Sequence, residues 1–488
     1  MKRLFPVVLV VLLGLAFVFP VTPSWAAGTL KVTMPNGGNK WQKGKSYPIR
    51  WNKGNAGKYV RIRLLKSGRH YRWVTKKTSN DGRYVWKIPT TVATGSNYKI
   101  RLQPFSKTGY DNSNRSFSIS SDSDKSVFMK GITFGAQLWP EKNLKWVDYN
   151  LDRLKTIGVD SIILVPDWYL DDYTDPTIEP WYRHKKGFPD TSWFSPTLYD
   201  REVKQIIRKA QARGFRVLLK PHVDTLDSPF GGIGRWGLRP AGNDWDTLFA
   251  SYFRFILHYA RIAESLNVDV FIIGTELDSM TYWGVADSGL NNPEERWRSM
   301  IKKIRRIYRG KLTYSSSDHG NRSRTKGTCS PCKIKFWDAL DYIGFEMYRG
   351  LTNRNRNPSL KQLMAGVRDT FDNYIEPLAQ QYQKQVIIPE IAFYSFDGVN
   401  TNPLGEPGVS PYLVSNSRVD HMEQANCFRA VLKVVDDIRS EKSYLEGIFW
   451  WDGHLIDPTA DYSWVKQHKY GFPWFKPAET IMRSFWSE

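Results

Sequence analysis

Eight short apolar segments, separated by longer amphipathic stretches, fill the C-terminal part of the chain and restrict its fold more than any other feature. Each segment is too short for a helix and rich in β-branched or aromatic residues, as expected of a strand that is buried on both faces. The eight segments are residues 131–136, 161–165, 216–220, 268–274, 312–315, 342–346, 386–390 and 447–451.

The stretches between these segments show the periodicity of helices that bury one face. They include residues 151–157, 202–213, 247–266, 292–308, 360–383 and 421–439. Strands that alternate with helices predict a parallel sheet, and eight such units predict a (β/α)8 TIM barrel over residues 128–488. An open doubly wound sheet is the alternative, but no glycine-rich phosphate-binding turn follows the first segment.

Residues 28–120 follow a different pattern, in which apolar and polar residues alternate with period two between Gly, Asn and Asp-Gly turns. The alternating segments are residues 30–34, 47–51, 60–64, 84–88, 98–102 and 116–119. In the third of them, Arg61 and Arg63 share one face, opposite the apolar residues. Six or seven strands in this length predict a small all-β sandwich of immunoglobulin-like shape. The polar, Ser-rich residues 121–127 are expected to form a linker.

The positive charge of the chain is concentrated in this β-rich module. Residues 28–120 contain 12 Lys and 8 Arg but only Asp81 and Asp111 as acids, so they carry +18 of the formal net charge of +22. Such a surface attracts polyanions through forces that salt screens. We expect residues 28–120 to dock on an anionic polymer of the cell envelope or matrix; the alternative is that the charge only maintains solubility. No nucleic-acid-binding motif is present, so we expect no nucleic acid partner.

Residues 1–26 have the organisation of a secretory signal peptide. Lys2 and Arg3 precede an apolar run over residues 4–21, and Ser-Trp-Ala at 24–26 supplies the small residues of a cleavage site after Ala26. A permanent membrane anchor is the alternative. No later segment reaches the length of a membrane span. We therefore expect an exported protein, secreted or associated with the cell envelope, without a transmembrane segment after cleavage.

Polar side chains gather where the predicted barrel strands end, which is the face that carries the active site in TIM-barrel enzymes. Glu276 follows the fourth strand and Glu390 closes the seventh. A carboxylate after a buried apolar strand is costly unless it is paired or used. Either glutamate alone is compatible with a structural ion pair. The presence of both at these strand ends favours a catalytic pair.

The barrel resembles clan A of the glycoside hydrolases and, within it, family 113, the β-mannanase family. The resemblance rests on Lys-Gly-Ile at 130–132, Leu-Lys-Pro-His-Val-Asp at 219–224, Phe-Ile-Ile-Gly-Thr-Glu-Leu at 271–277, Tyr-Ile-Gly-Phe-Glu-Met-Tyr at 342–348, Ile-Pro-Glu-Ile at 388–391 and Phe-Trp-Trp at 449–451. It implies that Glu276 is the acid/base and Glu390 the nucleophile of a retaining mechanism, with carboxyl groups about 5–5.5 Å apart.

The same resemblance implies supporting roles for other strand-end residues. Tyr348 would orient Glu390 and keep it ionised, and Trp451 would form the apolar floor beneath the reacting sugar. Thr275, where many clan members have Asn, would donate a hydrogen bond toward a sugar hydroxyl. Lys220 and His222 would bind sugar hydroxyls or tune the carboxylates; the alternatives are a buried ion-pair partner and a core histidine.

The export signal and the barrel predict a secreted enzyme without a cofactor. The resemblance to family 113 implies a retaining glycoside hydrolase that acts on β-linked polysaccharide, with the mannan type favoured. Residues 28–120 resemble the N-terminal Ig-like domain of yeast cell-wall-synthesis and Ser/Thr-rich surface proteins, on segments 47–51, 60–64, 80–89 and 97–102. That resemblance implies no catalysis. Two alternatives stay open: a non-catalytic polysaccharide-binding matrix protein, and a transglycosylase that remodels envelope glycans with the same two glutamates.

The positions of cysteine and tryptophan predict a disulfide, a buried thiol and aromatic side chains in loops. Cys329 and Cys332 form a Cys-x-x-Cys without two further zinc ligands nearby, so we expect a local disulfide and no metal site. Cys427 is expected to be a buried thiol. Several tryptophans are predicted to lie in loops at the barrel mouth, where they either stack on sugar rings or anchor the loops by packing. They are Trp168, Trp181, Trp193, Trp236 and Trp283.

Overall fold

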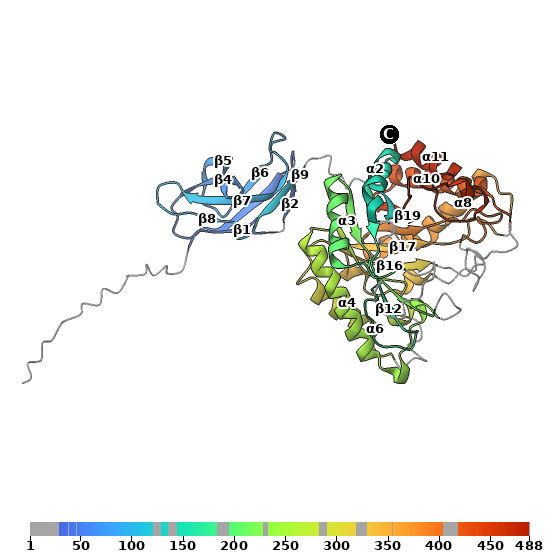
Figure 1. Ribbon diagram of the computed structural model, residues 1–488. Helices are drawn as coiled ribbons and strands as arrows, with labels where there is room; N and C mark the ends of the chain where they lie inside the picture. Colours follow the sequence, from blue (N-terminus) through green and yellow to red (C-terminus); the bar gives the residue numbers. More distant parts are fainter. Residues whose placement is uncertain are drawn as a thin grey trace, which may run out of the picture. The chain divides into compact units, whose positions relative to one another are not determined.

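The structure is a computed structural model of the 488-residue chain. It describes residues 29–37, 39–44, 46–120, 128–134, 144–182, 195–227, 233–282, 290–318, 329–353, 355–403 and 418–487. Contacts divide the chain into two compact units, Met1–Val127 and Phe128–Glu488 (Figure 1). The predicted signal peptide and linker, together with Trp193 and Trp283, lie outside the described residues.

Two β-sheets form the first unit, which confirms the predicted small all-β fold. One sheet pairs β1 (Lys31–Met34), β3 (Ser46–Asn52) and β6 (Arg83–Lys87) in antiparallel order β1-β3-β6. The other has the order β2-β9-β7-β4-β5, with β8 paired to β7. Its strands are β2 (Lys40–Gln42), β4 (Tyr59–Lys66), β5 (Arg69–Ser79), β7 (Gly95–Pro104), β8 (Asp111–Asn112) and β9 (Phe117–Ser120).

The alternation in β4 determines which side chains enter the core of this unit. Val60, Ile62 and Leu64 are fully buried, while Arg61 and Arg63 point to the opposite face, as the sequence predicts. The sequence pattern does not predict β5. This strand lies at the edge of its sheet and none of its residues is fully buried, so it lacks the apolar alternation that marks the other strands.

The second unit is a closed barrel of eight parallel strands, which confirms the predicted TIM barrel. The barrel strands, in order, are β10 (Met129–Phe134), β11 (Ser161–Leu164), β13 (Arg216–Leu219), β15 (Val270–Thr275), β16 (Lys311–Asp318), β17 (Tyr342–Met347), β18 (Gln385–Ile391) and β19 (Leu445–Gly453). Their residues are almost all buried because helices cover the outside of the barrel (Figure 1).

The helices around the barrel agree with the amphipathic stretches of the sequence. They are α2 (Val147–Ile157), α3 (Asp200–Ala212), α4 (Trp245–Ser265), α5 (Asp278–Thr281), α6 (Pro293–Ile304), α7 (Ser330–Lys333), α8 (Leu360–Thr370), α9 (Glu376–Tyr382), α10 (His421–Glu441) and α11 (Pro477–Trp486). The predicted helix over 360–383 is divided by one π-helical turn, Phe371–Ile375. Among the helices that the structure describes, none is long and apolar enough to cross a membrane.

A second parallel pair of strands continues beyond barrel strands β11 and β13. β12 (Asp167–Leu170) pairs with β14 (His222–Thr225), with Asp167 opposite His222. Trp168 lies on β12, where it is buried against Phe255 and Tyr259. The prediction that Trp168 lies in a loop at the barrel mouth is therefore wrong, because two short strands extend the barrel wall at this point.

Candidate active site

Glu390, near the end of β18, is buried between two polar partners. The ammonium group of Lys220, which follows β13, forms an ion pair with Glu390 Oε1. The hydroxyl of Tyr348, which follows β17, donates a hydrogen bond to Oε2 at 2.5 Å. Burial and the charge of Glu390 raise the pKa of Tyr348 well above its usual value, so the phenol keeps its proton and remains a donor. Both carboxylate oxygens are thus held in fixed directions.

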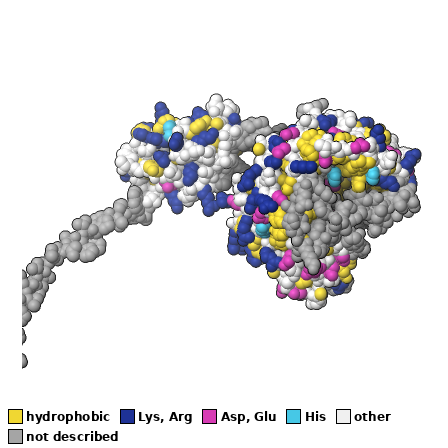
Figure 2. All heavy atoms as spheres, viewed as in Figure 1, with side chains coloured by type: hydrophobic (Ala, Val, Ile, Leu, Met, Phe, Trp, Pro, Cys, Tyr) yellow, Lys and Arg dark blue, Asp and Glu magenta, His cyan; other side chains and the backbone are white. Residues whose placement is uncertain are grey.

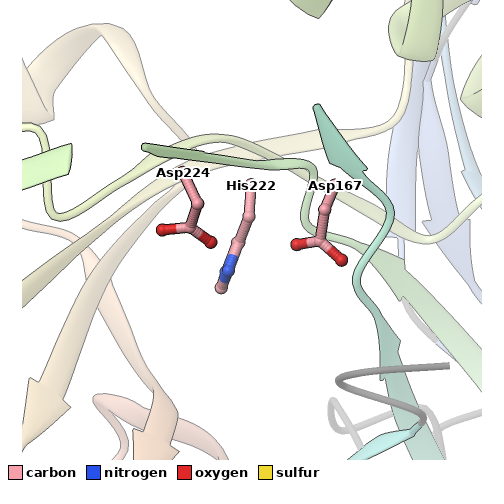
Figure 3. Close-up of side chains that lie close together, drawn as sticks. All are labelled: Asp167, His222 and Asp224. Carbon is pink, nitrogen blue, oxygen red and sulfur yellow. The ribbon is translucent and has the colours of Figure 1, made fainter. Parts of the chain in front are cut away.

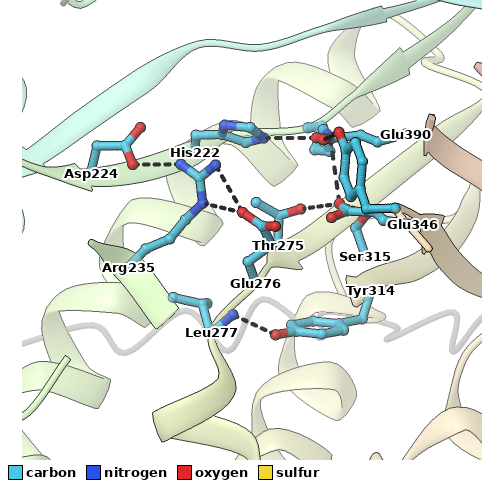
Figure 4. Close-up of polar contacts among 12 residues, drawn as sticks. His222, Asp224, Arg235, Thr275, Glu276, Leu277, Tyr314, Ser315, Glu346 and Glu390 are labelled. Carbon is cyan, nitrogen blue, oxygen red and sulfur yellow. Dashed lines mark hydrogen bonds and ion pairs between the residues drawn. The ribbon is translucent and has the colours of Figure 1, made fainter. Parts of the chain in front are cut away.

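Glu276 follows β15 in a left-handed backbone conformation, with φ = +50°. Its N–H donates to the carbonyl of Ser315 at 3.1 Å, and the N–H of Leu277 donates to the hydroxyl of Tyr314 at 2.8 Å (Figure 4). A left-handed residue other than glycine costs about 1–2 kcal/mol. The two hydrogen bonds hold the backbone in this turn, which leaves the Glu276 side chain 12% exposed.

Arg235 connects Glu276 to Asp224. Its Nε and Nη2 lie 3.2 Å and 3.1 Å from Glu276 Oε2, and its Nη1 lies 2.5 Å from Asp224 Oδ1 (Figure 4). Burial opposes the charge of Arg235, but the neighbouring carboxylates of Asp224 and Glu276 outweigh burial and raise its pKa. Arg235 is therefore a permanent cation beside the predicted acid/base.

Glu346, in β17, is a third carboxyl at the centre of the barrel and is fully buried. Its Oε1 accepts hydrogen bonds from Thr275 at 2.9 Å and Ser315 at 2.5 Å, and lies 3.8 Å from Lys220 Nζ. Burial, followed by the charges of Glu390 and Glu276, raises its pKa to about 8. Glu346 therefore holds a proton at neutral pH. The Thr275 hydroxyl, which the sequence assigns to a sugar, contacts Glu346 in the structure.

Asp167, His222 and Asp224 project side by side from β12 and β14 (Figure 3). Each offers one ligand atom, and these atoms lie within 4.8 Å of one another, so this group could hold a divalent cation by distance alone. However, the Arg235 guanidinium already forms an ion pair with Asp224, so a cation occupies one side of this carboxylate. Burial raises the pKa of both aspartates, and the second contribution for Asp167 comes from Asp224. We therefore describe the three as a polar wall beside Glu276.

Trp451, in β19, presents a partly exposed ring next to this wall. The His222 ring stacks on it with centroids 6.0 Å apart and planes inclined by 12°. Lys220 Nζ lies 5.3 Å from the centre of the Trp451 ring. Burial, then Arg235 and Lys220, lower the pKa of His222 well below its usual value, so the imidazole is neutral. Its Nε2 lies 4.0 Å from Glu390 Oε1.

The fold brings together all the residues that the sequence assigns to catalysis and substrate binding. They are Lys220, His222, Thr275, Glu276, Tyr348, Glu390 and Trp451. Lys220 is fully buried, so it is an ion-pair partner as well as a neighbour that tunes the carboxylates. Cys329 and Cys332, at α7, are joined by a disulfide with an S–S distance of 2.00 Å.

Sequence reasoning did not single out Arg235 or Glu346. Glu346 meets the criterion that identifies Glu276 and Glu390, since it is a carboxyl within a buried apolar strand, and applying that criterion to the sixth strand would have found it. Arg235 lies in a short 3-10 helix, Arg235–Gly237, within a glycine-rich loop. No periodicity marks that position, so only the folded chain places it beside Glu276.

Comparisons with known proteins give a family match in each unit. Residues 34–119 match the Kre9/KNH-like N-terminal Ig-like domain, and residues 143–462 match Glycoside Hydrolase Family 113. A search of curated proteins finds no match.

Two solved structures illustrate the likeness of the barrel. One is a complex of a family 113 β-1,4-mannanase, with 21% identity and a TM-score of 0.56 over 74% of this chain and 99% of that chain. The other is the family 113 β-mannanase of Alicyclobacillus acidocaldarius in complex with ManMIm, with 22% identity and a TM-score of 0.55 over 74% of this chain and 97% of that chain. These likenesses show a shared fold. Because the family match spans more than half of the chain, the protein belongs to glycoside hydrolase family 113.

Proposed function

We propose that this glycoside hydrolase is an exported, retaining enzyme that cleaves β-linked polysaccharide of the mannan type. The observation that carries the proposal is the pairing of two differently supported glutamates. Glu390 is held by Lys220 and Tyr348, and Glu276 is held by Arg235. The similar solved structures are β-mannanases, which supports the choice of substrate class. The signal-peptide pattern of residues 1–26 supports export.

In the first step, the Glu390 carboxylate attacks the anomeric carbon while Glu276 gives its proton to the departing glycosidic oxygen. The bond to the leaving group breaks and a glycosyl–Glu390 ester forms. The Tyr348 phenol and the Lys220 ammonium fix the direction of the attacking carboxylate. A nucleophile held in one orientation loses little entropy when it reaches the transition state.

In the second step, the Glu276 carboxylate takes a proton from water, and the resulting hydroxyl attacks the anomeric carbon and releases Glu390. Glu276 is negatively charged between the two steps. Arg235 donates two N–H groups to Oε2 of this carboxylate, so it stabilises the charge that the first step creates. We assign Arg235 as a positioning residue for Glu276.

The remaining side chains suit the binding of a sugar. The Trp451 ring offers an apolar platform for a pyranose. The neutral His222 ring stacks on this ring. Asp167 and Asp224 offer oxygen acceptors for sugar hydroxyl groups along the neighbouring wall.

The test compares reducing ends released from a panel of polysaccharides by wild type, Glu390→Ala, Glu276→Gln and Glu390→Gln. We expect each glutamate variant to remain folded and to lose about 10³-fold or more in turnover. Glu295→Gln, on the exposed surface of α6, is the matched control and should retain full activity. Wild-type turnover that survives replacement of both Glu276 and Glu390 would contradict a two-glutamate mechanism.

Product analysis separates the alternatives. The first-formed anomer, followed by NMR, should have the configuration of the substrate; the opposite anomer would indicate inversion. Oligosaccharides longer than the substrate at high acceptor concentration would identify a transglycosylase. Binding of a polymer without release of reducing ends from any member of the panel would favour a non-catalytic polysaccharide-binding protein.

A further inference from the structure

The outer face of the sheet in the N-terminal unit carries cations that lie on aromatic rings. Arg63 lies 4.2 Å from the centre of the Trp73 ring, and Arg61 lies 4.5 Å from that of Phe105. Arg101 lies 3.9 Å from the centre of the Tyr110 ring. Together with Lys77, which lies 4.3 Å from the Tyr59 ring, these residues define the basic face. Its members are Tyr59, Arg61, Arg63, Trp73, Lys77, Arg101, Phe105 and Tyr110.

Two of these cations oppose each other directly in the sheet. Arg63 on β4 pairs in register with Arg101 on β7. Like charges at directly opposite positions destabilise a sheet. Within residues 46–120, where the structure describes the chain without a gap, no ion pair with an acidic side chain is found for Arg61, Arg63 or Arg101. A bound anion would relieve the repulsion between Arg63 and Arg101.

The two acidic residues of the module are engaged by backbone groups. Asp111 Oδ2 accepts the N–H of Val32 at 2.7 Å, and Asp81 Oδ1 accepts the N–H of Arg83 at 3.0 Å. Neither contact involves a cation of the basic face. The positive charge of the face is therefore not neutralised by these two carboxylates. Figure 2 shows many Lys and Arg side chains and few acidic ones on the visible surface of this unit.

The guanidinium groups are held in place before any ligand binds. Arg61 donates from Nη2 to the carbonyl of Phe105 at 3.2 Å, and Arg101 donates from Nε to Asn112 Oδ1 at 2.8 Å. The Nε atoms of Arg61 and Arg63 are buried without a hydrogen-bond partner. A planar guanidinium that is fixed on a ring loses little freedom when its other N–H groups bind a carboxylate. The basic face is therefore prepared for anions with oxygen acceptors.

Aromatic surface remains exposed beside these cations. Phe105 is 37% exposed and Tyr110 is 60% exposed. A ligand that fits this face combines negative charge with rings that present apolar C–H faces. We propose that the basic face binds a polysaccharide that contains uronic acids, whose carboxylates pair with Arg63 and Arg101 while its pyranose rings contact Phe105 and Tyr110. A polyol phosphate chain supplies the charge but no ring.

Nucleic acid and anionic membranes are less suitable partners for this face. The attached family 113 hydrolase favours a glycan over either of them. Nucleic acid also combines negative charge with rings, so the test includes single-stranded DNA. The N-terminal unit has its own hydrophobic core, so binding at its basic face does not depend on the catalytic mechanism of the barrel.

The test measures binding of the full chain to polygalacturonate, an α-linked polymer that a β-glycosidase does not cleave, by isothermal titration calorimetry across a salt series. We expect Arg63→Gln/Arg101→Gln to weaken binding by about tenfold or more, because each arginine loses charge-assisted hydrogen bonds. Arg50→Gln/Arg83→Gln is the matched control. These arginines also pair in register, but on the other sheet, so the control removes the same charge. It should weaken binding by less than about threefold.

Four outcomes would overturn the proposal. Equal losses in the two double variants would show diffuse attraction without a site, and binding that ignores salt would exclude a charged contact. Tighter binding of single-stranded DNA or polyphosphate than of polygalacturonate would identify a different polyanion. Equal binding to vesicles that contain anionic lipid would identify a membrane. Melting temperatures of both variants control for unfolding, and the Arg63→Gln/Arg101→Gln variant should be at least as stable as wild type.

Discussion

Glu346 gives the active site a third carboxyl, and its protonation sets the charge around Glu390. Lys220, Glu276, Glu390 and Tyr348 are the titratable groups that face it, beside the hydroxyls of Thr275 and Ser315. While Glu346 is neutral, the Lys220 ammonium balances the negative charge of Glu390. Once Glu346 ionises, a second anion competes for the same ammonium group.

We therefore predict that wild-type kcat/KM falls as the pH rises above about 8, because the raised pKa of Glu346 places its ionisation there. Glu346→Gln imitates the neutral form, so this variant should keep most of its activity near neutral pH and lose that alkaline decline. The measurement is a pH profile of both proteins. Identical alkaline limbs would show that another group controls them.

The same carboxyl makes stability depend on pH. Between about 4.3, the pKa of an unfolded glutamate, and about 8, the folded chain holds a proton on Glu346 that the unfolded chain has lost. Stability therefore falls as the pH rises through this window. Glu346→Gln removes this penalty, so the melting temperature of the variant relative to wild type should be higher at about pH 9 than at about pH 5. A constant difference across that range would contradict the assignment.

Tyr348 contributes one hydrogen bond to the nucleophile. Tyr348→Phe removes the hydroxyl that donates to Glu390 at 2.5 Å and keeps the ring. A hydrogen bond to a charged group contributes about 1.5–3 kcal/mol, so we expect kcat to fall by about 10- to 150-fold. KM should change much less, since the hydroxyl contacts Glu390. Unchanged kcat would show that Lys220 alone positions the carboxylate.

At the scale of the elements, close approach of neighbouring strands requires glycine in β17. A Cβ at Gly344 would lie 2.2 Å from the carbonyl oxygen of Tyr314 on β16. Gly344→Ala must therefore move backbone of the barrel wall, and we predict a loss of about 3 kcal/mol or more in the free energy of unfolding.

Gly214, after α3, is the control for this substitution. Its φ is +73°, but a Cβ there meets no atom within 4 Å. Gly214→Ala should cost only the left-handed strain of about 1–2 kcal/mol. Thermal unfolding of the two variants measures both values. Equal losses would mean that β16 and β17 can separate without cost.

At the scale of the whole molecule, the separate hydrophobic cores of the two units support a division of labour. One core lies within the β-rich unit and another lies within the barrel unit. Removal of residues 28–120 should therefore leave the hydrolysis of a small soluble oligosaccharide nearly unchanged, while retention on anionic polymer is lost. Parallel assays of full-length and truncated protein test this. A folded truncation without turnover would show that the β-rich unit contributes to the substrate site.

Salt should separate the two activities of the full-length protein. Exposed Lys and Arg attract a polyanion less as salt rises, since the Debye length is about 8 Å at physiological ionic strength. Contacts among the buried Lys220, Glu346 and Glu390 are screened far less. We predict that rising salt lowers retention on polyuronate and leaves turnover of a neutral oligosaccharide nearly constant. Parallel decline of both would contradict independent binding and catalytic surfaces.

The sequence by itself determined the barrel and the order of its strands and helices, and it marked Glu276 and Glu390 as a predicted catalytic pair. Burial on both faces makes each barrel strand a short apolar run, and a carboxyl such as Glu276 or Glu390 stands out against it. Where a strand is only partly buried, as β5 is, that signal is absent.

Only the tertiary structure decided how the side chains combine into a site. Arg235 reaches Glu276 across 41 residues of chain, and Lys220 reaches Glu390 across 170. The Thr275 hydroxyl donates a hydrogen bond to Glu346, and Arg63 lies opposite Arg101 on the neighbouring strand. Such pairs depend on strand register and on loops without periodicity. The sequence therefore determined which residue types line each strand. The contacts between those residues, and the protonation that follows from burial, depend on the folded chain.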